Sequence, residues 1–193
     1  IAASEYLYIE GYLVTSPSGR AAAIEAKRLA EEAGVKTALT FSDPAMVQFF
    51  RDGLAEMVGT GVDMLFCNEA EALAWTGCED LEAAFVALQP IAKSFAITLG
   101  SKGAILFDGE TIHKVEPHAI TAVDSNGAGD MFAGALLFSL SRGDSFPEAG
   151  KLASLASAKV VQSFGPRLLK EAHAAILAEV FDAHPAAVNL PVI

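Results

Sequence analysis

The chain has 193 residues, of which 52% are hydrophobic and 19% charged, and its formal net charge is −11. This length suffices for one sizeable domain, and the composition is that of a globular rather than a disordered chain. The negative charge argues against nucleic-acid binding, which needs a basic surface. It still allows a phosphate ligand held by backbone N–H groups and a metal ion.

Several features favour a cytoplasmic protein that does not cross a membrane. Cys67 and Cys78 are too few for a disulfide framework, so reduced thiols are the simplest interpretation. We find no signal-peptide pattern, and the longest apolar run, which starts at Met131, is shorter than the ~20 residues that span a bilayer. The chain begins at Ile1 without a methionine, which suggests truncation or processing.

The first half of the chain alternates predicted strands with predicted helices. Ser16-Pro17 and Asp43-Pro44 are helix starts, each with a capping residue before a proline. In chain order we expect a strand at 6–9, helix 17–33, strand 35–41, helix 44–57, strand 62–66, helices 69–75 and 81–92, and a strand at 95–99. Such alternation implies crossover connections, so the sheet of this α/β fold should be mostly parallel.

The pattern changes after residue 99. Segments 103–107 and 111–115 flank Asp108-Gly109 and indicate a hairpin. Helices follow at 128–141, 146–164 and 168–181, and the tail from His184 carries little signal. No repeat or linker interrupts the chain, so we expect a single α/β domain over residues 1–193.

The most informative stretch is the loop Asp124-Ser125-Asn126-Gly127-Ala128-Gly129-Asp130, which an apolar run follows at once. It indicates a turn that brings backbone N–H groups and an acid to the start of a buried helix, and such amides form an anion site. A plain strand-to-helix turn remains the alternative, since glycines are common there.

The residues of this loop do not match other known ligand-binding loops. An EF-hand counted from Asp124 needs oxygen ligands where Ala128 and Ala135 stand. A dinucleotide fingerprint needs a glycine at Phe132, so a Rossmann-like oxidoreductase is disfavoured. No Walker A pattern occurs, and any use of ATP would therefore proceed without a P-loop.

Phosphoryl transfer to an alcohol fits this loop. The amides of Gly127, Ala128 and Gly129 would face the charge that builds on the transferred phosphate. Asp130 would accept the proton of the attacking hydroxyl as a general base. Asp124 would either shape the loop or bind a cation.

Two further motifs lie at the ends of predicted strands. Asn68-Glu69-Ala70-Glu71 opens a helix, where it is either a capping segment or a site in which Glu71 organises hydrated Mg²⁺. Thr98-Leu99-Gly100-Ser101-Lys102-Gly103 lies between two strands. It is either a turn or a nucleotide-phosphate loop with Thr98 and Gly100 as contacts.

The three motifs resemble, in order and spacing, those of the ribokinase-like (PfkB-type) carbohydrate kinases, which include adenosine kinase. Residues 124–134 resemble the family's Asp-Thr-x-Gly-Ala-Gly-Asp signature, with Ser125 in place of threonine. Asn-x-x-Glu and Thr-x-Gly-x-x-Gly are matched by Asn68, Glu71, Thr98, Gly100 and Gly103. The resemblance covers roughly residues 6–165, and segments 11–15 and 41–42 look more like the adenosine-kinase branch.

This resemblance implies a three-layer αβα fold and an ATP-dependent phosphotransferase acting on a hydroxymethyl group of a sugar or nucleoside. It makes Asp130 the catalytic base, Gly127–Gly129 the anion hole, and Asn68 and Glu71 the residues acting on Mg²⁺ and phosphate. Segment 153–165, which includes Ser157, resembles the region beside the adenine pocket. Some members bind a monovalent cation such as K⁺ near the position of Asp124.

One departure from the family is large. Family members are longer, and the N-terminal strands, the small β lid and most sugar contacts have no counterpart here, so the chain resembles the C-terminal, nucleotide-binding portion. An exposed sheet edge favours poor solubility or self-association, with a homodimer among the expected assemblies. A catalytically inactive nucleotide-binding or regulatory module of the same fold is the alternative function.

Overall fold

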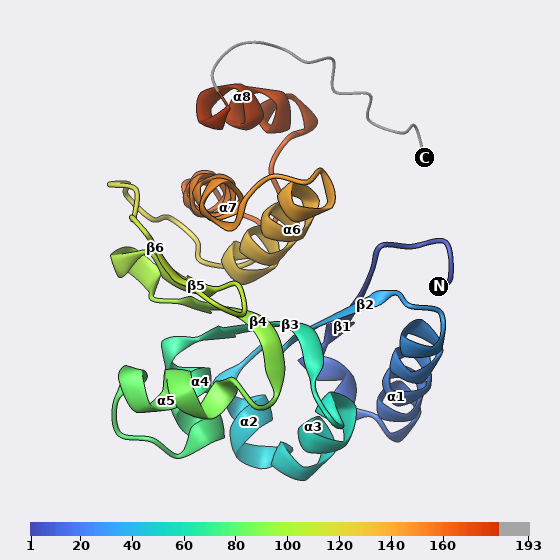
Figure 1. The fold of residues 1–193 in the computed structure, drawn as a ribbon. Helices are drawn as coiled ribbons and strands as arrows, with labels where there is room; N and C mark the ends of the chain where they lie inside the picture. Colours follow the sequence, from blue (N-terminus) through green and yellow to red (C-terminus); the bar gives the residue numbers. More distant parts are fainter. Residues whose placement is uncertain (182–193) are drawn as a thin grey trace. The chain divides into compact units, whose positions relative to one another are not determined.

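The structure, a computed structural model, describes residues 1–181. It divides into two compact units, one ending at Pro117 and the other beginning at His118. Unit 1 contains a six-stranded sheet and its covering helices, and the described part of unit 2 consists of helices and the loops that join them (Figure 1).

The strands of unit 1 lie in the sheet in sequence order. The first four are parallel to one another, and the last two form an antiparallel hairpin beside the fourth. Their bounds are β1 Tyr6–Glu10, β2 Lys36–Thr40, β3 Val62–Asn68, β4 Ala92–Thr98, β5 Ala104–Phe107 and β6 Ile112–Val115. The α/β class, the mostly parallel sheet and the hairpin expected from the sequence are confirmed.

The helices of unit 1 cover one face of its sheet (Figure 1). This follows from connecting each parallel strand to its next neighbour by a right-handed crossover, which always returns on the same side. The core between sheet and helices contains the fully buried Leu39, Leu65 and Phe95. The helices are η1 Gly11–Thr15, α1 Pro17–Glu32, α2 Pro44–Phe49, α3 Arg51–Val58, α4 Glu69–Thr76, α5 Leu81–Leu88 and the short turn η2 Gly100–Lys102.

Both predicted helix starts are confirmed. The Ser16 hydroxyl accepts a hydrogen bond from the Gly19 amide at 3.3 Å, and Pro17 is the first residue of α1. Asp43 accepts one from the Ala45 amide at 2.7 Å, immediately before α2. Each cap satisfies an amide that the helix itself leaves without a partner.

Two predicted helices of unit 1 had wrong bounds. The helix expected at 44–57 is broken at Phe50, whose backbone is not helical, because α2 packs on α4 whereas α3 packs on α1. The helix expected at 81–92 ends at Leu88, and β4 begins at Ala92. Pro90 lies between them and has no N–H to continue a helix.

In unit 2, α6 spans Ala128–Ser141, α7 Phe146–Val160 and α8 Lys170–Val180. The first was predicted with these bounds. The second ends before the expected residue 164, because the Val161 carbonyl accepts hydrogen bonds from the amides of Val123 and Asp124. Helix α8 starts at 170 rather than 168, and the tail from His184 lies outside the described residues.

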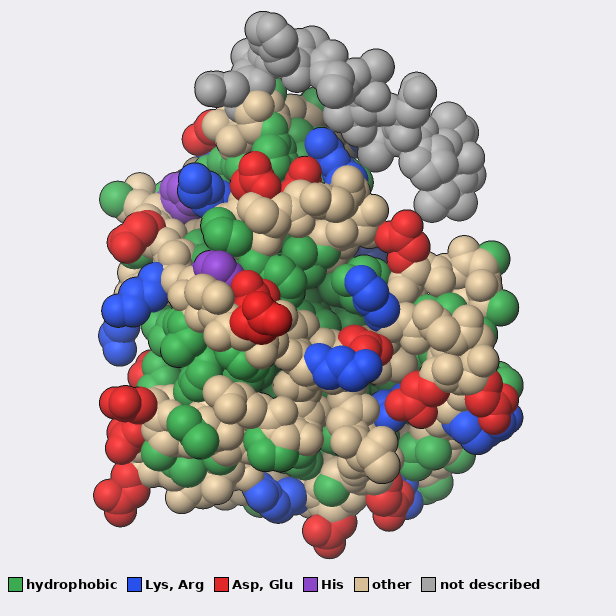
Figure 2. Space-filling model, viewed as in Figure 1, with side chains coloured by type: hydrophobic (Ala, Val, Ile, Leu, Met, Phe, Trp, Pro, Cys, Tyr) green, Lys and Arg blue, Asp and Glu red, His purple; other side chains and the backbone are tan. Residues whose placement is uncertain are grey.

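The surface carries charges of both signs. Figure 2 shows basic side chains scattered among acidic ones on the visible face, without a continuous basic patch. Cys67 is buried, Cys78 is half-buried, and both are free thiols. None of the helices in the described part of the chain is long and apolar enough to cross a membrane.

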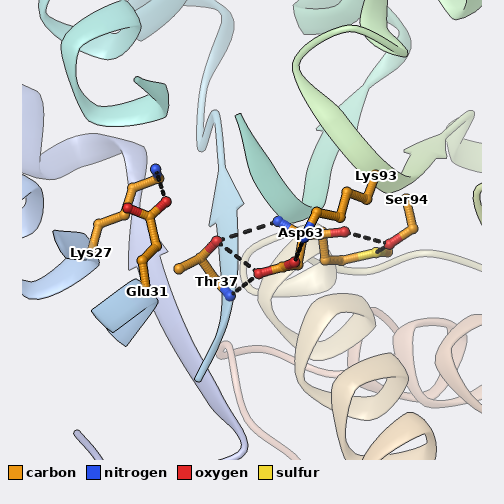
Figure 3. A network of polar contacts seen from close by, with 7 residues as sticks. Lys27, Glu31, Thr37, Asp63, Lys93 and Ser94 are labelled. Atoms are coloured by element: carbon orange, nitrogen blue, oxygen red, sulfur yellow. Dashed lines mark hydrogen bonds and ion pairs between the residues drawn. The ribbon is translucent and has the colours of Figure 1, made fainter. Parts of the chain in front are cut away.

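A polar network ties the amino ends of three parallel strands together (Figure 3). One oxygen of the Asp63 carboxylate on β3 accepts hydrogen bonds from the Thr37 amide at 2.7 Å and hydroxyl at 3.2 Å, both on β2. Its other oxygen pairs with the Lys93 ammonium on β4 at 2.7 Å. Partial burial raises the pKa of Asp63, but the bonds from Lys93 and Thr37 outweigh it and hold that pKa below its ordinary value.

We predict that Asp63→Asn lowers the free energy of unfolding by about 1 kcal/mol near pH 7, since charge-assisted hydrogen bonds are lost. Because the folded-state pKa of Asp63 is depressed, its stabilisation is present above the unfolded pKa and is lost as pH falls through the folded pKa. Urea unfolding of both proteins at several pH values tests this, with Glu110→Gln as control. A difference that stays constant down to pH 2 would contradict the assignment.

Candidate active site

Two of the three sequence motifs meet at the carboxyl edge of the sheet in unit 1. Asn68 is the last residue of β3, Thr98 is the last residue of β4, and the two are register partners. Ligands of open α/β sheets bind outside the carboxyl ends of the strands. The Lys102 ammonium lies 3.7 Å from the Glu69 carboxylate and links the two motifs at this edge.

The Asn68–Glu71 motif forms a capping box at the start of α4. The Asn68 side-chain oxygen accepts from the Glu71 amide at 2.9 Å. In return, the Glu71 carboxylate accepts from the Asn68 amide at 3.0 Å and from its side-chain nitrogen at 2.7 Å. The capping interpretation is therefore correct, and it fixes the Glu71 carboxylate in one orientation.

Glu71 is only 3% exposed, and no Lys, Arg or His of residues 1–181 forms an ion pair with its carboxylate. Burial raises the pKa of Glu71, the bond from the Asn68 amide partly offsets this, and the negative charge of Asp43 raises it further, to about 7. A cation beside this carboxylate would stabilise its ionised form, so the residue fits a magnesium site. No group of three potential metal ligands occurs in residues 1–181, and Mg²⁺ commonly keeps several of its waters.

The loop from Thr98 to Gly103 makes the short helical turn η2 before the hairpin. A Cβ atom on Gly100 would meet nothing within 4 Å, so this side of the loop is open to a ligand. A Cβ on Gly103 would lie 2.0 Å from the Val115 carbonyl oxygen, and the Gly103 φ angle is +89°. Packing alone therefore explains why residue 103 is glycine, and its contact with a nucleotide stays a prediction.

Asp124 in unit 2 anchors its own loop. Its carboxylate accepts hydrogen bonds from the Asn126 amide at 3.0 Å and from the Gly165 amide at 3.1 Å. These two amides, Asn126 first, lower the pKa of Asp124 below its ordinary value. Shaping the loop, the first of the two roles expected for this residue, is what the structure shows.

The start of α6 presents free backbone donors. The Ala128 amide donates to the Ser125 carbonyl at 3.2 Å, whereas those of Gly127 and Gly129 have no protein acceptor among the described residues. The Asp130 carboxylate is exposed and makes no hydrogen bond or ion pair within residues 1–181. The Ser157 hydroxyl donates to the Ala128 carbonyl at 2.9 Å and so holds the first turn of α6 against α7.

Some residues at these sites were not found by sequence reasoning. Lys102 and Glu69 face each other only because β3 and β4 are paired in this register. Asp43, for which the sequence favoured a cap over a position facing the substrate, also acts electrostatically on Glu71 from beyond the end of the neighbouring strand. Ser42 has a φ of 69°, the sole positive value at a non-glycine residue in the described chain, and no sequence pattern signals it.

A cavity of about 430 Å³ lies at the opposite edge of the sheet, among the turns that enter β2, β3 and β4. Its lining includes Glu31, Thr37, Asp63 and Lys93, which belong to or adjoin the network of Figure 3. None of the three motifs contributes to it. We therefore place the part of the candidate site that belongs to unit 1 at the carboxyl edge, where the Asn68–Glu71 and Thr98–Gly103 motifs lie.

Comparison with known proteins identifies the family. The model of the pfkB family of carbohydrate kinases matches residues 1–172, and the chain belongs to this family.

Relatives agree with the adenosine-kinase branch. The adenosine kinase of Schizophyllum commune is 32% identical over 192 residues, covering 86% of this chain and 53% of the relative. The solved adenosine kinase of Sinorhizobium meliloti is 36% identical, with a TM-score of 0.87 over 92% of this chain and 55% of that one. A ribokinase II structure from E. coli shares the fold at 21% identity, with a TM-score of 0.81 over 91% and 59%. The chain thus spans about half the length of these relatives.

We predict that Glu71→Gln becomes more stable relative to the unchanged protein as pH rises. A carboxyl whose folded pKa is raised to about 7 contributes stability below its unfolded pKa that is lost as pH rises through 7. The free-energy difference between the two proteins should therefore shift by roughly 2 kcal/mol between pH 5 and pH 8. Denaturant unfolding in chelator-treated buffer measures it, and Glu69→Gln should show no such trend.

The glycines of the α6 loop should respond differently to alanine. Gly127 has a φ of +75°, and a Cβ there would lie 2.5 Å from the Pro166 carbonyl oxygen, so Gly127→Ala should destabilise by roughly 1–3 kcal/mol. Gly129 lies in α6 with open space around it, so Gly129→Ala should be neutral or stabilising by up to about 1 kcal/mol. Equal destabilisation of both variants in thermal unfolding would contradict this.

Proposed function

We propose that this chain is the nucleotide-binding portion of an ATP-dependent kinase that phosphorylates a hydroxymethyl group of a sugar or nucleoside. The observation that carries the proposal is the start of α6, where free amides stand beside an exposed carboxylate without a protein partner in residues 1–181. Membership of the pfkB family supports it. In this proposal both units, residues 1–193, form one functional domain.

Gly127, Ala128 and Gly129 form the proposed anion hole. Their amides would stabilise the charge that develops on the phosphoryl group during transfer. Since the Ala128 amide already donates to Ser125, the two glycine amides are the immediately available donors. Asp130 follows them in the first turn of α6 and takes the proton of the attacking hydroxyl.

ATP and Mg²⁺ are the proposed cofactors. The E. coli ribokinase II structure is described as a complex with ATP and Mg²⁺, which supports this choice at the level of the shared fold. When bound, the metal would neutralise phosphate charge. Glu71 would hold it through water, and the nucleotide contacts would come from Asn68, Thr98, Gly100, Gly103 and Ser157, while Asp124 would lie near a K⁺ ion.

The acceptor, the cellular location and the oligomeric state are further parts of the proposal. Two of the relatives described above are adenosine kinases, which favours a nucleoside over a free sugar. A cytoplasmic location agrees with the two free cysteines. Self-association of this chain by itself, with a homodimer among the expected assemblies, is proposed from the edge of β1, which pairs only with β2 among the described strands.

We predict that Asp130→Asn in the intact natural protein lowers kcat by about 10²–10⁴-fold, the usual contribution of a general base, while the Kd for ATP changes little. The reason is that the amide cannot accept the hydroxyl proton. Steady-state kinetics and calorimetry measure the two quantities, with Asp52→Asn as the matched control. Wild-type turnover in the Asp130 variant would exclude it as the base.

An acceptor panel separates an active kinase from an inactive module. ATP consumption by the intact natural protein is measured with adenosine, other nucleosides, ribose and fructose, and the phosphorylated product is identified by mass spectrometry. We expect phosphorylation of at least one nucleoside or sugar. Nucleotide binding without transfer to any acceptor would instead assign the protein as a nucleotide-binding or regulatory module.

A further inference from the structure

The two motifs of unit 1 are poor in positive charge for a site that handles phosphates. Residues 68–71 and 98–103 contain two acids, Glu69 and Glu71, and a single base, Lys102. The chain as a whole carries a net charge of −11. A triphosphate brought to this edge therefore meets mainly negative side chains, and Lys102 is the only side-chain cation that these motifs supply.

The position of Lys102 suits a contact with phosphate. It is the last residue of η2, directly beyond the carboxyl end of β4, and its amide donates to the Leu99 carbonyl at 3.2 Å. The backbone of the residue is thus fixed in the turn, whereas its side chain is 72% exposed and free to reorient. Its ammonium can donate up to three hydrogen bonds to phosphate oxygens.

The partner of Lys102 holds it only loosely. The Glu69 carboxylate lies 3.7 Å from the ammonium, longer than a hydrogen bond, and is itself 41% exposed. Exposed ion pairs of this kind contribute little to stability. A ligand that carries several negative charges can therefore take Lys102 from Glu69 at small cost.

We propose that Lys102 binds the phosphates of the nucleotide and that Glu69 competes with the nucleotide for its ammonium. The inference rests on the proposed function, because it assumes that a nucleoside triphosphate binds at this edge of the sheet. It adds a residue pair to that site. Lys102 binds the ligand, and Glu69 determines how readily Lys102 is available for that contact.

The proposal predicts effects of opposite sign at the two positions. Lys102→Ala removes the cation, so the Kd for ATP should rise about tenfold. Glu69→Gln removes the competitor, so the Kd should fall by a factor of about two to five. In the double variant Glu69 has no cation left to hold, and its Kd should equal that of Lys102→Ala.

Isothermal titration of the intact natural protein with Mg²⁺ and a non-hydrolysable ATP analogue measures these constants. Lys114→Ala, which removes an exposed positive charge from β6, is the control and should leave Kd within a factor of two. Lys102→Gln serves as a second variant if Lys102→Ala unfolds at a lower temperature than the unchanged protein. Binding to the unchanged protein should also weaken more steeply with added salt than binding to Lys102→Ala.

Three results would overturn the inference. An unchanged Kd in both Lys102 variants would remove Lys102 from the site, even if the unchanged protein binds ATP and phosphorylates an acceptor. If Glu69→Gln also tightens ATP binding when Lys102 is already replaced by alanine, Glu69 simply repels the phosphates and does not compete with them for Lys102. Failure of the unchanged protein to bind any nucleotide would overturn the proposed function together with this inference.

Discussion

The parallel pairing of β3 with β4 is the constraint on which the candidate site of unit 1 depends. It makes Asn68 and Thr98 register partners and so brings two motifs that are distant in sequence to one edge of the sheet. A shift of one residue would also turn each buried side chain of a strand to the other face, so the hydrophobic core fixes the register. The ion pair between Lys102 and Glu69 is a direct consequence of that register.

Local signals made much of the fold predictable. Ser16, Asp43 and the start of α6 at Ala128 were placed correctly because caps, prolines and glycines act within a few residues. The break at Phe50 and the early end of α7 were missed because contacts with other segments determine them. The three motifs could be recognised because each is a short continuous segment. The effect of Asp43 on Glu71 and the pairing of Glu69 with Lys102 could not be predicted, because they depend on how separate strands lie side by side.

The structure separates the physical reasons for glycine at four positions of the sequence motifs. Gly103 and Gly127 are needed by packing, because a side chain there would collide with the Val115 and Pro166 carbonyl oxygens. Gly100 and Gly129 have free space beside them, so packing does not require them. Gly100 has a φ of +59°, a backbone conformation that favours glycine. Gly129 lies in α6, so access of a ligand to the backbone is the remaining physical reason for a glycine there.

The central claim is that the start of α6 binds the phosphates of a nucleotide. Amide hydrogen exchange of the intact natural protein, with increasing amounts of Mg²⁺ and a non-hydrolysable ATP analogue, tests this most directly. The account predicts that segment 127–130 becomes protected as the nucleotide binds, with the half-saturating concentration that calorimetry gives for the same analogue. Binding of the analogue that leaves the exchange of segment 127–130 unchanged would contradict it.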